Sequence, residues 1–395
     1  MSTTQPHPAT VSTRALAWSA YASFVPTGMV TVLLAPLLPI LSTRWSLDYS
    51  TAGALFPAQF MASTVAVALS GAMVSRWGFR VAIKSGLVLM GTSVALLLAG
   101  SKIQGIICIA GYGAGYGITV PAANLLVSEV NPVGRSAALN TLNFCWSLGA
   151  VLCPFLVAAA DKSHHIGLLL AFIAGMALVI ALGIALMPSS IVEPAGSRMS
   201  GNAISVSWSD PMVFVIAAMF CVYVGTETAF GGWVASYAKS LGTLSLPIAL
   251  LMPSCFYGCL MIGRWLAPLV LRAVDEIHLA KAGVLTACAG MMWLLFSHSL
   301  LTVAGSACLA GLGLSSVYPI TISLLSREFG SAAARVGSVA FTVANLGGSA
   351  LPWLVGVSSQ QLGSLKAGMA VPLLGAVGML ILYQRKWKPL SQTAQ

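Results

Sequence analysis

Glu227 is an acidic residue in the middle of a long apolar stretch, residues 214–238. A carboxylate at the centre of a membrane costs about 2.5–3.5 kcal/mol on insertion scales. No other acid lies in the middle of a predicted membrane span. Because intramembrane acids usually mark the path of a substrate or an ion, Glu227 is the first candidate for a binding or coupling residue.

Aromatic residues accompany this acid along the chain. Tyr223, Glu227 and Phe230 share one face of a predicted helix. A carboxylate flanked by aromatic rings suits a sugar, since the acid accepts hydroxyl hydrogen bonds and the rings cover the apolar face. The acid could also carry a proton, because burial favours its neutral form. Residues 231–232, both glycine, could break the helix and turn Trp233 toward the same site. The alternative is that Glu227 is a structural hydrogen-bonding residue between helices.

Polar side chains form a stripe along one face of two other predicted helices. Such stripes suit a water-filled cavity, although Asn, Ser and Thr also hydrogen-bond between membrane helices. The stripes consist of Asn140, Asn143 and Ser147 in one helix and of Ser338, Thr342, Asn345 and Ser349 in the other. Single polar or aromatic candidates for solute contact are Tyr21, Gln59, Asn124 and Tyr318.

Three charged residues near the ends of predicted spans are candidates for a gate. Arg264 lies about two turns inside the end of span 245–271, where an arginine removed from water needs an acceptor or extends its side chain to the surface. Glu129 and Glu328 close two other spans beside arginines, so they could form salt bridges that open and close, or they could be solvated helix ends.

The composition is that of a membrane protein. The 395 residues are 58% hydrophobic and 7% charged, whereas a soluble domain carries about 25% charged residues. Apolar runs near the length needed to cross a bilayer recur along the chain, and their unbroken character excludes a β-barrel. The expected spans are about 15–41, 50–74, 82–100, 104–129, 136–160, 166–187, 211–238, 245–271, 278–297, 299–326, 334–358 and 365–384.

The net charge of +10 reflects topology rather than nucleic-acid binding. With both termini in the cytoplasm, thirteen of the 19 Lys and Arg residues fall on the cytoplasmic side and five on the outside, and Arg264 lies within a span. This bias is the positive-inside rule. The short loops favour a bacterial-type inner membrane. The eight cysteines all lie in predicted spans without metal or redox spacing, so no metal or cofactor is expected.

The two halves of the chain resemble repeats of each other. A shift of 198 residues superposes Gly113 on Gly311 and Pro121 on Pro319. Two halves in the same orientation predict a pseudo-two-fold axis along the membrane normal, with a binding site between them near the midplane. The expected organisation is a cytoplasmic tail (1–14), a six-helix bundle (15–187), a cytoplasmic linker (188–210), a second six-helix bundle (211–385) and a tail (386–395).

The loop after the second span resembles a motif of the major facilitator superfamily. The family pattern G-x-x-x-D-R-x-G-R matches here at Gly71, Arg76 and Gly78, with Arg80 one place late and Ser75 where the family has Asp. The resemblance covers nearly the whole chain. It implies an all-α fold of twelve transmembrane helices in two pseudo-symmetric bundles, and it implies that Arg76 and Arg80 belong to an inner gate. The missing Asp puts the family's usual charge latch in question.

Within that superfamily, two short phrases are similar to the fucose–galactose–hexose symporters. Residues 121–124, Pro-Ala-Ala-Asn, resemble the branch's E-x-A-A-N, with Val120 in the place of the acid. The pattern Tyr-x-Gly-x-Glu that ends at Glu227, followed by Gly-x-Trp, also looks like sugar transporters. If the protein is proton-coupled, Glu227 must therefore carry the proton alone.

The resulting expectation is a secondary transporter, not an enzyme, that moves a monosaccharide with a proton or a sodium ion. It is expected to work as a monomer in the lipid bilayer, without nucleic acid. A drug/proton antiporter is the first alternative, although the fifth span lacks that group's adjacent Gly-Pro and double Gly. An uncoupled sugar uniporter is the second. A membrane enzyme would need a nucleophile with a base, paired carboxylates or a metal cluster, and none is visible. A sensor is disfavoured because no soluble signalling domain is apparent.

Overall fold

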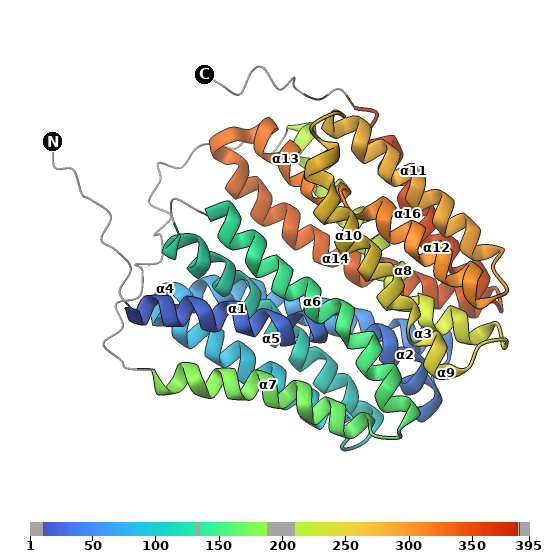
Figure 1. Ribbon diagram of the computed structural model, residues 1–395, viewed down its shortest axis with the longest axis horizontal. Helices are drawn as coiled ribbons and strands as arrows, with labels where there is room; N and C mark the ends of the chain where they lie inside the picture. The colour runs from blue at the N-terminus through green and yellow to red at the C-terminus, as the bar shows by residue number, and fades with distance from the viewer. Residues whose placement is uncertain (1–10, 132–134, 188–209, 386, 388–395) are drawn as a thin grey trace.

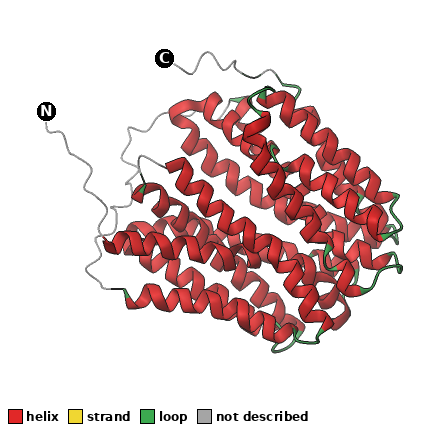
Figure 2. Ribbon diagram, in the orientation of Figure 1, coloured by secondary structure: helices red, strands yellow, loops and turns green. Residues whose placement is uncertain are grey.

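The chain folds into an all-helical bundle (Figures 1 and 2). A computed structural model describes residues 11–131, 135–187, 210–385 and 387, and within them no strand is present. The first half comprises α1 (Val11–Val32), α2 (Leu34–Arg44), α3 (Tyr49–Gly53), α4 (Leu55–Leu96), α5 (Lys102–Val130), α6 (Arg135–Lys162) and α7 (Ile166–Leu186). The second half comprises α8 (Pro211–Ser240), α9 (Leu246–Ala249), α10 (Met252–Val270), α11 (Glu276–Leu295), α12 (Leu300–Leu314), α13 (Val317–Phe329), the 3₁₀ turn η1 (Gly330–Ala332), α14 (Ala333–Gln361), α15 (Leu365–Gly368) and α16 (Ala370–Leu382).

The described helices provide the twelve expected crossings. Ten helical segments are long and apolar enough to span a membrane, and the bent pair α1–α2, with a 44° angle, adds another. The segment Tyr49–Leu96 has 48 residues, about twice the length that a single crossing needs, so it provides two of the twelve crossings. It is interrupted at Gly78, whose φ of 82° is open to glycine but strained for other residues. The motif glycine therefore supplies the turn between the second and third spans.

Glycine contacts confirm the internal repeat. A Cβ on Gly113 would lie 2.3 Å from the carbonyl oxygen of Gln59, and a Cβ on its repeat mate Gly311 would lie 2.1 Å from that of Phe256. Both distances are far below van der Waals contact, so both helices approach a neighbouring backbone through a glycine. The same relation holds for Gly149, whose Cβ would meet the oxygen of Val25, and for its mate Gly347, whose Cβ would meet that of Cys221.

Replacing Gly311 by alanine is expected to destabilise the protein. The added methyl group would force α12 away from α10, and overpacking of this kind costs about 1–3 kcal/mol. Thermal unfolding of the purified protein measures the effect. Gly258→Ala is the matched control, because no atom of the described residues lies within 4 Å of the position that its Cβ would occupy. Equal melting temperatures for the two variants would contradict the close approach of α10 and α12.

The two halves meet tightly at one end of the bundle, called here the α3 end, where α2 ends and α3 begins (Figure 1). Gly53 of α3 and Gly356 of α14 face each other, since a Cβ on Gly356 would lie 3.0 Å from the Cα of Gly53. The backbone N–H of Tyr49 donates to the side-chain oxygen of Gln360 at 3.2 Å. Nearby, the Ser254 hydroxyl of α10 donates to the carbonyl of Val151 in α6 at 3.0 Å.

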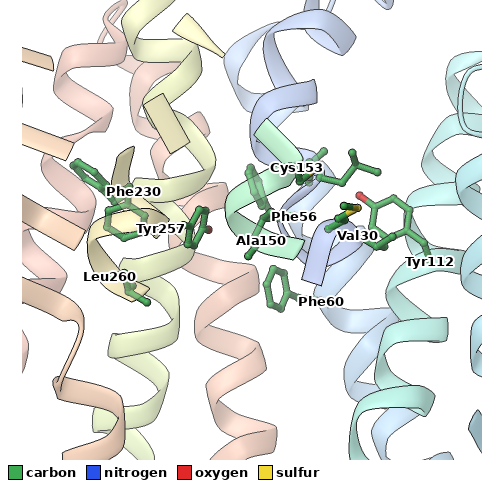
Figure 3. Packing of buried hydrophobic residues seen from close by; sticks show 14 of the residues in the cluster. Val30, Phe56, Phe60, Tyr112, Ala150, Cys153, Phe230, Tyr257 and Leu260 are labelled. Carbon is green, nitrogen blue, oxygen red and sulfur yellow. The ribbon is translucent and has the colours of Figure 1, made fainter. Parts of the chain in front are cut away.

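Apolar side chains extend this contact into the bundle. Figure 3 shows Phe56 and Phe60 of α4, in the first half, on the side that faces Phe230 and Tyr257 of the second half. The ring of Phe60 also packs against Gly348 of α14, where a Cβ would approach it to 2.8 Å. The interface between the halves is therefore closed at the α3 end.

Candidate functional site

The central feature of the bundle is an ion pair between Glu227 and Arg264. Glu227 lies near the middle of the 30-residue α8. Arg264 lies within α10, about 9 Å before the last residue of that helix, Val270. Arg264 Nη2 is 3.8 Å from Glu227 Oε2. The Arg264 side chain is 27% exposed, and the Glu227 side chain is 15% exposed. Opposite charges in a membrane interior neutralise each other, so the acid that the sequence singled out is the counter-charge of Arg264.

Tyr223, one turn before Glu227 on α8, also contacts Arg264. Its hydroxyl accepts a hydrogen bond from Arg264 Nη2 at 3.3 Å and donates one to the carbonyl of Leu314 at 3.3 Å. The ring of Tyr223 packs on that of Tyr318, with centroids 5.4 Å apart. Tyr318 stands in the first turn of α13, directly after the break that separates α12 from α13. Three of the predicted site residues thus lie together with Arg264.

Two further tyrosines complete the cluster, and sequence reasoning missed both. Tyr116 of α5 and Tyr257 of α10 each interact electrostatically with Glu227. Tyr116 belongs to the first half, so the site is built from both bundles. Its spacing of four residues from Tyr112 on a glycine-rich helix was a usable signal. We call Tyr116, Tyr223, Tyr257 and Tyr318, each of which interacts electrostatically with Glu227, the tyrosine cage.

Replacing Tyr223 by phenylalanine is expected to reduce transport about fivefold or more. The change removes one acceptor from a charged donor, and such hydrogen bonds contribute about 1.5–3 kcal/mol. Initial uptake rates in proteoliposomes measure it. Tyr237→Phe is the control, because that buried hydroxyl also donates to a backbone carbonyl, that of Leu294, and contacts no charged group in the described residues. Equal rates for the two variants would remove Tyr223 from the site.

The polar stripes on α6 and α14 become less exposed toward the α3 end. On α6, Asn140 and Asn143 are exposed and Ser147 is buried. On α14, Thr342 is exposed, Asn345 is half-buried and Ser349 is buried. Polar side chains that are accessible within membrane-spanning helices usually face water rather than lipid. The parallel gradients indicate that the space between the halves opens away from the α3 end.

Other predicted contact residues are engaged elsewhere. Gln59 is 2% exposed, and its amide donates to the carbonyl of Thr31 at 3.1 Å. Asn124 and Asn143 each donate to a carbonyl of their own helix, four residues earlier. Tyr21 is half-buried on α1 beside Trp18. These residues line or support the first bundle, and the structure gives none of them a contact with the tyrosine cage.

Trp233 packs at the closed interface. It is 1% exposed, and its indole N–H donates to the carbonyl of Pro352 at 2.8 Å. Its ring lies 6.3 Å from that of Phe56 and 6.4 Å from that of Tyr49, both in the first half. The helix α8 runs unbroken through residues 231–232. The expected helix break is therefore wrong, because the two glycines serve close packing against Tyr257 and Phe56 instead.

The predicted gate residues occupy different settings. Arg80 donates to the carbonyls of Ile184, Ala185 and Met187, so it caps the end of α7. Arg76 stacks over the ring of Trp77 at 5.5 Å. Glu129 and Glu328 are half-buried near the ends of α5 and α13. Arg264 lies in the interior, beside Glu227. Across the described residues, no group of His, Cys, Asp and Glu side chains could hold a metal ion. The expected linker 188–210 lies outside the described residues except for Asp210.

The family comparison decides the identity of the fold. The model of the Major Facilitator Superfamily matches residues 20–352. The chain belongs to this family. It is accordingly a multi-pass membrane protein of a transporter family, and not an enzyme.

Curated relatives of this transporter match it over most of its length. A TsgA homologue from Edwardsiella ictaluri is 23% identical over 79% of this chain and 80% of the relative. An uncharacterized MFS-type transporter from Yersinia pestis is 23% identical over 91% of each chain. None of these names refers to a sugar, so the resemblance to the fucose–galactose–hexose branch stays a prediction.

Solved structures of the superfamily share the fold. A bacterial homologue of the human lysosomal transporter Spinster, in an inward-facing and unoccupied conformation, has a TM-score of 0.76 at 14% identity, and covers 96% of this chain and 100% of its own. The xylose transporter of E. coli, in its inward open conformation, has a TM-score of 0.73 at 16% identity, and covers 97% and 98%. At these identities the similarity concerns the fold alone.

Proposed function

We propose that the protein is a secondary active transporter that moves a small polar solute, a monosaccharide, by alternating access with proton symport. The observation that carries the proposal is the partly accessible Glu227–Arg264 pair of the second bundle, whose tyrosine cage includes Tyr116 of the first bundle. Carboxylate, guanidinium and phenol groups are hydrogen-bonding partners for sugar hydroxyls, and aromatic rings cover a sugar's apolar faces.

The ion pair also offers a route to proton coupling. Glu227 pairs with Arg264 and interacts electrostatically with the four tyrosines of the tyrosine cage, and no second acid takes part among the described residues. Arg264 supplies the counter-charge of Glu227 while the pair is closed. A solute that separates the two groups removes this counter-charge, and Glu227 takes up the proton in its place. Binding of solute and binding of proton are then linked through one side chain.

The same ion pair is also compatible with a second function, that of an uncoupled sugar uniporter. If Arg264 neutralises Glu227 in every step of the cycle, no proton moves. A drug/proton antiporter is less well supported, since four phenol hydroxyls and two charges favour a hydrophilic solute.

Uptake of labelled hexoses into proteoliposomes, with and without an inward proton gradient and with sodium, tests the proposal. Concentrative uptake that requires protons supports symport, and a requirement for sodium would replace the proton. Uptake that stops at equilibrium identifies the uniporter. Absence of uptake for every monosaccharide would overturn the sugar assignment and make lipophilic cations the next probes.

A further inference from the structure

Arg264 has more hydrogen-bonding capacity than the described residues use. A guanidinium carries five N–H donors, and here Nη2 donates to the hydroxyl of Tyr223. Oε2 of Glu227 is 3.8 Å away, beyond hydrogen-bond distance. Nε is buried and has no hydrogen-bond partner in the part of the chain that the structure describes. A buried donor of a charged group that stays unpaired is costly, so the arginine is set up to receive a further acceptor.

The charge balance of the site says what kind of acceptor it is. Glu227 and Arg264 together carry no net charge. If a neutral sugar binds and Glu227 takes up a proton, Arg264 remains in the bundle as an uncompensated cation, and an unpaired buried charge is strongly destabilising. If the solute brings its own carboxylate, that group replaces Glu227 as the counter-charge of Arg264. The site then stays neutral with solute and proton both bound.

The geometry of the two groups supports this exchange. A carboxylate can accept two parallel hydrogen bonds from one guanidinium, and this arrangement is stronger and more specific than a single hydrogen bond. Tyr116 and Tyr318 are half-buried, so their hydroxyls remain accessible to a sugar. Because Glu227 is 3.8 Å from the guanidinium and not at hydrogen-bond distance, the N–H groups of Arg264 are not used by Glu227 and can bind the solute's carboxylate.

We propose that the transported monosaccharide is a sugar acid, whose carboxylate binds Arg264 while Glu227 accepts the co-transported proton. This inference rests on the proposed transport function and names the substrate class for the same site. One anion and one proton then move together, so the transport cycle is electroneutral.

The first test compares matched sugars that differ by oxidation at one carbon. Proteoliposomes receive labelled glucuronate or glucose, and galacturonate or galactose, with an inward proton gradient. We expect each uronate to accumulate about tenfold or more above its hexose. We also expect that an inside-negative potassium diffusion potential, imposed with valinomycin, leaves uronate uptake unchanged. Preference for the hexoses, or stimulation of uronate uptake by the potential, would overturn the inference while leaving sugar transport intact. Failure of all four sugars to enter would overturn the proposed function itself.

The second test assigns the carboxylate to Arg264 by binding rather than by transport. Glucuronate is titrated into purified protein, and the rise in melting temperature is recorded. We expect Arg264→Gln to weaken glucuronate binding about tenfold or more, Arg264→Lys to weaken it less, and Glu227→Gln to retain or strengthen it because the competing carboxylate is gone. Lys239→Gln removes an exposed positive charge at the end of α8 and should bind as the unaltered protein does.

A folding defect is separated from a binding defect with a double variant. Arg264→Gln alone leaves Glu227 without its cation, so it can destabilise the bundle. Glu227→Gln combined with Arg264→Gln removes both charges and should melt near the unaltered protein, yet show no shift with glucuronate. A glucuronate shift that persists in the double variant would overturn the role of Arg264.

Discussion

Replacing Glu227 by glutamine is expected to abolish concentrative uptake while exchange of solute across the membrane continues. Glutamine keeps the size and hydrogen-bonding capacity of the side chain but cannot take up a proton. Exchange requires only that the loaded protein change conformation, whereas accumulation requires the return of the site without its proton. Accumulation should therefore fall to the equilibrium level, and the exchange rate should stay within about tenfold.

The measurement is a pair of assays on the same proteoliposomes, gradient-driven accumulation and counterflow. Asp161→Asn is the control for loss of an acid away from the Glu227–Arg264 pair. Asp161 lies at the end of α6, where it lines a pocket with Arg44 and His164 at the α3 end. Glu227→Asp retains the acid on a shorter side chain and should retain partial accumulation. Full accumulation by Glu227→Gln would remove Glu227 from coupling and would favour the uniporter.

Replacing Gly356 by valine is expected to stop transport without unfolding the protein. A Cβ at this position would lie 2.3 Å from the carbonyl oxygen of Tyr49 and 3.0 Å from the Cα of Gly53, both in the opposite bundle. The α3 end could then no longer close, so the cycle would halt with that end open. We expect uptake to fall about tenfold or more, because closure of the bundle on one side is a required step of alternating access.

Two other glycine replacements separate closure from folding. Gly378→Val in α16 introduces the same side chain at a position with no described atom within 4 Å of the added Cβ, so uptake should persist. Gly347→Val places a Cβ 1.9 Å from the carbonyl oxygen of Cys221, within one bundle, so its effect should appear as a lower melting temperature. Normal uptake by Gly356→Val would show that the Gly53–Gly356 contact does not form during transport.

The fold was predictable from the sequence because it depends on signals that are local or periodic. The apolar runs define the twelve crossings, and the repeat-related glycines Gly113 and Gly311 report a packing relation that the structure confirms. The motif glycine Gly78 likewise marks a turn that requires positive φ. Each of these signals lies within one helix or recurs at a fixed shift.

The composition of the site was less predictable, because it depends on how helices rotate against each other. Glu227 was recognisable as an acid in the membrane, and Arg264 as a base inside a helix end. Their pairing across α8 and α10 was not, since nothing in either segment specifies the facing partner. Tyr116 escaped notice for the same reason. Trp233 was assigned to the site from a helix break that does not occur, because its glycines accommodate neighbouring side chains.

The close glycine contacts within each bundle have a mechanical consequence. Gly28 and Gly149 bring the backbones of α1 and α6 together, and Gly225 and Gly347 do the same for α8 and α14. Helices that interlock backbone to backbone resist sliding along each other. We therefore expect each helix pair to move as one rigid unit. The two units would tilt against each other when solute crosses the membrane, and the side chains that must rearrange are the aromatic ones at the interface between the bundles.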